Sequence, residues 1–314
     1  MRPVRLAYRD RDRLPLIACI REMARRHYDV VVVVVRIQPT GEYEAALFDD
    51  RCDLIVEHLE FLYARAAAQA AAHPETEATM FCAPVDRTGV ELMALPAVKD
   101  VSELRGKTIA VRSSGRPDSL YMRLKAAGLD PGDTVLVADG DVGRWGQWKK
   151  VVSGECAAVF MSPLYMAPAE AAGLKVLPVP DLPMVGQFGH ACLTRFAAEN
   201  DALMEDYVRA VVHAICLMKY RPKEALEVVL AAPTTQAGDT AAELERRIGI
   251  IAQTLLTTPF PSEEAIANTH QIAVAQDPAS AGVDPRTLWN ARWVEQLERS
   301  GFIARLVEEL RADG

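Results

Sequence analysis

A carboxylate and an imidazole stand side by side in the sequence, at Glu57 and His58. They end an apolar run that starts at Cys52 and has the composition of a β-strand. Side chains of these two types transfer protons near neutral pH when they contact a substrate. We predict that both residues are catalytic, with His58 as the proton donor. The alternative is a surface glutamate beside a histidine with satisfied hydrogen bonds, because adjacent strand residues point to opposite faces.

The segment RSSGRP, residues 112–117, has the composition of an anion-binding loop. It follows an apolar run and precedes a helical pattern in which Pro117 suits the first turn. Backbone N–H groups at a helix start, with hydroxyl groups beside them, favour an anion. The alternative is a serine that only caps the helix. We predict four ligand contacts in this loop: Ser113, Ser114, Gly115 and Arg116.

The segment RDRDR follows the first apolar run of the chain. An arginine can bind a carboxylate through two parallel hydrogen bonds. We therefore predict ligand contacts at Arg9, Arg11 and Asp12. The alternative is a solvated loop in which Asp12 caps the next helix.

Further candidate ligand contacts follow the later apolar runs, because an open α/β sheet binds its ligands at the carboxyl ends of its strands. Trp145 is predicted to stack on a flat ligand, with packing inside the protein as the alternative. Gln187 and His190 lie near the point where the chain is expected to return to its first lobe. The remaining predicted contacts end the run 156–162: Met161 and Ser162.

No metal or nucleotide motif accompanies these residues, since the sequence contains no P-loop, GxSxG, HExxH or GxGxxG pattern. A mononuclear metal at Glu57, His58 and His190 would have suitable ligand types, but the spacing carries no metal signature. No cofactor is predicted.

The elements that position these residues alternate between strand and helix, which predicts an α/β fold. Strand patterns lie at residues 4–8, 30–37 and 52–58, and a new series begins at residue 107. The β-branched run 30–37 predicts a strand that is buried on both faces. The last third is helical, with Trp289 and Trp293 at a spacing that predicts core packing on one helix.

Three segments, ELRGKTIAV, LKAAGLDPGDTV and VVSGECAAVFMSPLYM, resemble the type II periplasmic-binding-protein fold. The resemblance is to the subgroup of nitrate-, sulfonate- and taurine-binding proteins and thiamine-pyrimidine synthases, with dihydroxyphthalate decarboxylase-like intracellular relatives. It covers roughly residues 4–195. It implies two lobes with a ligand cleft between them and a helical C-terminal region. We expect lobe one at residues 1–97 plus 194–314, and lobe two at residues 98–193.

This resemblance leaves several functions open. We expect a small anionic ligand, in particular a carboxylated organic molecule, and favour an intracellular lyase of the decarboxylase type. In that hypothesis Ser113, Ser114 and an arginine hold the acid while His58 donates the proton. The alternative is a solute-binding protein of an ABC transporter, and a third hypothesis is a sensor lobe. The cysteine-rich iron motif of the thiamine-pyrimidine synthases is not recognisable.

The composition limits the kinds of partner that we expect the protein to bind. The chain has 314 residues and a formal net charge of −8, and it lacks a dense basic patch, so no nucleic-acid partner is expected. Its apolar runs are too short to span a membrane. We expect a cytoplasmic protein if Met1 is the native start, and a periplasmic one if a signal peptide was removed. The six scattered cysteines are expected to be free and buried. The sequence does not determine the oligomeric state.

Overall fold

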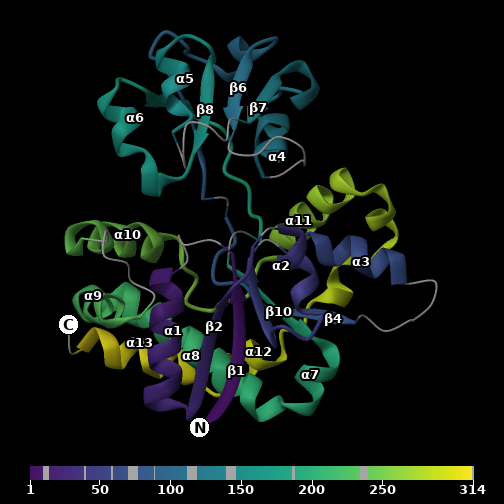
Figure 1. The fold of residues 1–314 in the computed structure, drawn as a ribbon, viewed down its shortest axis with the longest axis vertical. Helices are drawn as coiled ribbons and strands as arrows, with labels where there is room; N and C mark the ends of the chain where they lie inside the picture. Colours follow the sequence, from purple (N-terminus) through teal and green to yellow (C-terminus); the bar gives the residue numbers. More distant parts are fainter. Residues whose placement is uncertain are drawn as a thin grey trace.

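The structure is a computed structural model that describes residues 1–9, 14–38, 40–57, 59–69, 77–87, 89–111, 119–138, 146–185, 188–233 and 240–312. These residues form two lobes, one above the other in Figure 1, with chain segments running between them. Each lobe contains a five-stranded sheet with parallel and antiparallel neighbours. The predicted α/β fold with two lobes is confirmed.

The first sheet has the strand order β2-β1-β3-β10-β4. β1 is parallel to both of its neighbours, and β10 is antiparallel to β3 and β4. The strands are β1 (Arg2–Tyr8), β2 (Val30–Arg36), β3 (Leu54–Glu57), β4 (Ala78–Cys82) and β10 (Gly189–Leu193).

β2 departs from the prediction that its valine run is buried on both faces. The strand lies at the edge of the sheet, and burial decreases along it until Val33 is 44% exposed. β-branched residues favour the strand conformation, but that preference does not reveal whether a strand has one neighbour or two.

The second sheet has the strand order β7-β6-β8-β5-β9. β6 is parallel to β7 and β8, whereas β5 is antiparallel to β8 and β9. The strands are β5 (Glu91–Ala94), β6 (Thr108–Val111), β7 (Val135–Ala138), β8 (Ala158–Met161) and β9 (Lys175–Val176).

The sheet pairing differs from the expected lobe boundaries at two strands. β5 pairs with β8 in the second sheet although it precedes residue 97, and β10 pairs with β3 in the first sheet although it precedes residue 194. The chain therefore passes between the lobes once between β4 and β5, and again between β9 and β10. An apolar pattern in the sequence predicts that a segment is a strand, but it does not predict which sheet the strand joins.

Helices cover both faces of each sheet. In the first lobe, α1 (Leu14–His27) and α8 (Asp201–Tyr220) share one hydrophobic cluster with the sheet. On the other face lie α2 (Thr40–Ala46), α3 (Phe61–Gln69) and α11 (Glu263–Gln276). In the second lobe, α4 (Ser119–Ala126) and the 3₁₀ turn η2 (Val101–Leu104) cover one face. The other face is covered by α5 (Trp148–Val152) and α6 (Ala167–Ala171).

The C-terminal region is helical, as expected. It begins with α7 (Thr194–Glu199), which precedes α8. α8 ends at Tyr220 because Pro222 disfavours helical geometry in the residue before it, and Pro222 itself begins the next helix. The remaining helices are α9 (Pro222–Ala231), α10 (Ala241–Thr254), α12 (Arg292–Arg299) and α13 (Phe302–Ala312). Trp293 is buried in α12, but Trp289 follows a 3₁₀ turn, so the two tryptophans do not share a helix.

All six cysteines are free and buried, as predicted. Across the described ranges, no helix combines the length and the apolar character that a membrane crossing requires.

Candidate functional site

The parallel pairing of β1 and β3 brings Arg9 and Glu57 together at the carboxyl ends of these strands. Tyr8 is paired with Val56, so the next residue of each strand also lies side by side. The backbone N–H of Arg9 donates a hydrogen bond to Glu57 Oε1 at 3.3 Å, and Arg9 Nη2 lies 3.5 Å from Glu57 Oε2. The Glu57 side chain is 1% exposed and that of Arg9 is 28% exposed. A buried carboxylate therefore fixes an arginine that reaches solvent.

His190 lies on the opposite face of the same sheet. It is paired with Val56 across β10 and β3, and both residues face α8, where His190 Nδ1 lies 3.1 Å from Tyr207 Oη. Burial lowers the pKa of His190 to about 3, so the imidazole is neutral at physiological pH. Its Nε2 atom has no hydrogen-bond partner among the described residues. The structure thus places His190 in the core of the first lobe.

Glu57 and His190, two of the three residues of the possible metal site, are therefore apart. Glu57 lies one residue beyond Val56 in β3 and therefore points away from the face that carries His190. Within the described part of the chain, no group of three or more potential metal ligands comes together.

Gly189, which the sequence pattern does not identify as a special position, lies where β10 comes close to the end of β3. A Cβ atom at this position would lie 2.9 Å from Leu59 Cδ1 and 3.3 Å from the Glu57 carbonyl oxygen. Glycine lets β10 pass this close to the end of β3, whereas a larger residue would require the Leu59 side chain to move. No local pattern in the sequence announces such an approach, because the contact joins residues far apart in the chain.

The carboxyl end of β8 carries Met161 and Ser162. Met161 is fully buried and packs in the cluster that joins the second sheet to α5 and α6. The Ser162 hydroxyl accepts a hydrogen bond from the Leu164 N–H at 3.4 Å and caps the 3₁₀ turn η4 (Pro163–Tyr165). Ser162 thus lies at the expected strand end, and its contact with a ligand stays a prediction.

The other predicted site residues lie outside the described residues. β6 ends at Val111 and α4 begins at Ser119, and the predicted anion loop falls in the undescribed segment between them. The residues concerned are Arg11, Asp12, His58, Ser113, Ser114, Gly115, Arg116, Trp145 and Gln187.

A buried arginine, also unforeseen from the sequence, ties α4 to both segments that run between the lobes. Arg123 Nε donates to the Pro180 carbonyl oxygen at 3.0 Å, and its Nη1 donates to the carbonyl oxygen of Val90. α4 also contacts the first lobe, because Met122 packs with Met184 and with Ile272 of α11. The helix that follows the predicted anion loop is therefore anchored where the lobes meet.

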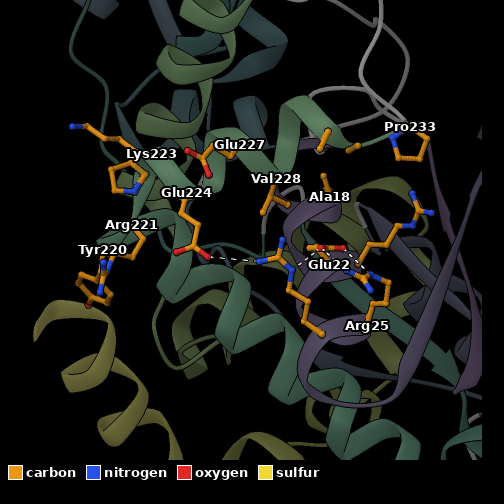
Figure 2. A pocket seen from close by; sticks show the side chains of 15 residues that line it. Ala18, Glu22, Arg25, Tyr220, Arg221, Lys223, Glu224, Glu227, Val228 and Pro233 are labelled. Carbon is orange, nitrogen blue, oxygen red and sulfur yellow. Dashed lines mark hydrogen bonds and ion pairs between the residues drawn. The ribbon is translucent and has the colours of Figure 1, made fainter. Parts of the chain in front are cut away.

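An open groove lies elsewhere in the first lobe, between α1 and α9, and has a volume of about 1060 Å³ (Figure 2). Four of its charged side chains, Glu22, Arg25, Arg26 and Glu224, form ion pairs with one another. Glu22 accepts hydrogen bonds from Arg25 and Arg26, and Arg26 Nη1 also lies 3.8 Å from Glu224 across the groove. Arg25 is the main cause that lowers the pKa of Glu22 to about 2. None of the predicted site residues that the structure describes lines this groove.

No family model matches the sequence, and no curated protein matches it. Solved structures match over nearly the whole chain. One is a periplasmic sulfonate-binding protein, SsuA, from Methylobacillus flagellatus KT, at 16% identity and a TM-score of 0.68, covering 96% of each chain. Another is the periplasmic aliphatic sulphonate binding protein SsuA from Escherichia coli, at 16% identity and a TM-score of 0.66, covering 93% of each chain.

A third is the periplasmic nitrate-binding protein NrtA from Synechocystis PCC 6803, at 10% identity and a TM-score of 0.63, covering 97% of this chain and 90% of the other. At these identities the likeness shows the fold alone. The chain has the type II periplasmic-binding-protein fold, as the sequence resemblance implied. The resemblance to thiamine-pyrimidine synthases and decarboxylases stays a prediction.

Proposed function

We propose that the protein binds a small anion between its two lobes and serves as a solute-binding protein of an ABC transporter. Sulfonate- and nitrate-binding proteins with the same fold support this proposal, since they match this chain along nearly its full length. Two-lobed proteins bind small ligands preferentially where their domains meet.

The observation that carries the proposal is the arginine at the carboxyl end of β1. Arg9 is fixed by the buried Glu57, which limits the side-chain entropy that an incoming anion would otherwise have to remove. A guanidinium group binds carboxylates bidentately and matches the planar or tetrahedral oxygens of other small oxyanions. The predicted anion loop after β6 would supply the second half of the site from the other lobe.

A decarboxylase-type lyase has less support. That hypothesis uses Glu57 as an acid–base group together with His58, whereas the Glu57 carboxylate contacts both the backbone and the guanidinium of Arg9. Such a carboxylate has a positioning role that needs no proton transfer. Conversion of a bound carboxylate into a product would favour the lyase hypothesis.

The experiment is a thermal-shift screen with nitrate, sulfate, methanesulfonate, taurine, benzoate and phthalate, with sodium chloride as the ionic-strength control. A ligand at about 100 times its Kd stabilises the native state by about 2.7 kcal/mol, which is a readily measured shift. Each anion that binds is then incubated with the protein and analysed by mass spectrometry. We expect at least one anion to bind and to be recovered unchanged. Loss of carbon dioxide from a carboxylate would favour the lyase, and no binding in the panel would contradict the proposal.

A further inference from the structure

A short turn of the second lobe makes contacts in two directions. Ser162 caps the turn, and its carbonyl oxygen accepts a hydrogen bond from the Tyr165 N–H at 2.9 Å. Leu164, in the middle of the turn, is 7% exposed and belongs to the hydrophobic cluster of the first lobe, which also contains Leu244 and Ile248 of α10. The turn that begins at a predicted ligand contact therefore packs against the opposite lobe.

An arginine of α10 holds this turn from the first lobe. Arg246 Nη2 donates a hydrogen bond to the Leu164 carbonyl oxygen at 2.5 Å. The same guanidinium donates to Glu243 on its own helix, at 3.1 Å from Nε and 2.9 Å from Nη2. Arg247 supports the arrangement, since its Nε also donates to Glu243 and its guanidinium carbon lies 5.8 Å from the centre of the Tyr165 ring.

The charges that form this contact persist at neutral pH. The hydrogen bond from Arg246 is the main cause that lowers the pKa of Glu243 below its usual value. An ionised glutamate one turn away leaves the arginine few orientations, and a hydrogen bond from a charged donor is stronger than one between neutral groups. The Glu243–Arg246 pair is thus a preoriented donor aimed at a carbonyl of the other lobe.

We propose that Arg246, oriented by Glu243, is a positioning residue that keeps the turn 162–165 against α10 and thereby sets how tightly the two lobes close on an anion. The inference rests on the proposed function only for its effect on binding. A ligand that needs closed lobes binds with an apparent affinity that scales with the closed fraction. Loss of the contact therefore weakens binding without removing any group that touches the anion.

The first test needs no ligand. Spin labels at Glu170→Cys in α6 and Glu308→Cys in α13 report the distance between the lobes, because both positions are exposed and all native cysteines are buried. We expect Arg246→Ala to broaden the distance distribution toward longer values. Arg246→Lys should restore part of the native distribution, since an ammonium can still donate to the carbonyl, and Glu243→Gln should give an intermediate result.

The matched control is Arg25→Ala, which removes a pair of the same i, i+3 type within α1; the polar contacts given for Arg25 among the described residues are all to Glu22. It should leave the distance distribution unchanged. A native distribution in Arg246→Ala, or an equal change in Arg25→Ala, would overturn the proposal.

The second test measures binding of sulfate and taurine by stopped-flow fluorescence. For whichever of the two binds, Arg246→Ala should weaken affinity about tenfold, equivalent to roughly 1.4 kcal/mol. The loss should appear in the dissociation rate, with the association rate nearly unchanged. Equal dissociation rates in the wild type and in Arg246→Ala would contradict the inference. If neither anion binds, the proposed function fails for these anions, and the ligand-free distance still decides the role of Arg246.

Discussion

At the scale of single residues, the pair of Arg9 and Glu57 is the feature most closely tied to ligand binding. Each residue is placed by the strand that precedes it, and the register of β1 with β3 makes them neighbours. The carboxylate is buried and the guanidinium is partly exposed. The two residues are therefore unequal: the Glu57 carboxylate is shielded from water, while the Arg9 guanidinium is partly solvated.

This asymmetry predicts unequal effects of substitution. Arg9→Ala removes an ion-pair partner from a buried carboxylate and should lower the free energy of unfolding by about 3 kcal/mol. Glu57→Gln leaves a solvated arginine and should cost about 1 kcal/mol. Urea unfolding monitored by circular dichroism measures both values.

The double variant Arg9→Ala with Glu57→Gln serves as the control for this pair. It should be more stable than Arg9→Ala alone, because the neutral amide needs no counter-charge. A double variant at the sum of the two single losses would show that the residues do not interact.

At the scale of elements, α4 connects the predicted anion loop to the segments between the lobes through Arg123. This side chain is 2% exposed and donates to the carbonyl oxygens of Val90 and Pro180. Arg123→Met keeps the length of the side chain but removes a charged donor from both carbonyl oxygens, so we expect a loss of about 3 kcal/mol in the free energy of unfolding.

Lys125→Met is the matched control, since Lys125 is exposed on the same helix. Its effect should stay within about 0.5 kcal/mol, as for most surface substitutions. Equal midpoints of urea unfolding for the two variants would contradict the role given to Arg123.

The element scale also shows how far the sequence could predict the fold. The strand runs 4–8 and 52–58 and the helical last third depend on local composition, and the structure has β1 at Arg2–Tyr8, β3 at Leu54–Glu57 and helices through most of the last third. The edge position of β2 and the sheets that β5 and β10 join depend on pairing between distant segments. No local periodicity encodes such pairing.

The same distinction applies to the site. Arg9 and Ser162 lie at strand ends, which a strand prediction locates directly. The inward orientation of His190 depends on its register with Val56, and the limited space at Gly189 depends on the approach of Leu59. Both are tertiary effects that the sequence pattern does not carry.

At the scale of the whole molecule, two histidines make stability depend on pH. Burial lowers the pKa of His190 to about 3 and is the main cause that lowers the pKa of His213 to about 4. In the unfolded chain both titrate near 6.5. Between about pH 6.5 and pH 4 the unfolded state therefore binds more protons, so the free energy of unfolding falls as the pH is lowered.

We expect a loss of up to about 1.4 kcal/mol per pH unit for each histidine in this range. His213→Gln retains a partner for the Tyr28 hydroxyl, which lies 3.2 Å from His213 Nδ1, and removes one titrating group. Urea unfolding at pH 7 and pH 5 should show a smaller difference for this variant than for the wild type. An equal difference would mean that His213 binds a proton in the folded state as readily as in the unfolded chain.

The proposed function of the whole molecule requires an anion between the lobes, in contact with Arg9 and away from the groove between α1 and α9. Isothermal titration calorimetry with the anion that gives the largest thermal shift tests this location most directly, using Arg9→Lys and Arg25→Ala. Lysine keeps a counter-charge for Glu57 but loses bidentate binding, so Arg9→Lys should bind at least about tenfold more weakly than the wild type. Arg25→Ala should bind like the wild type, with one anion per chain. Normal binding by Arg9→Lys together with lost binding by Arg25→Ala would place the anion in the outer groove and contradict the proposed site.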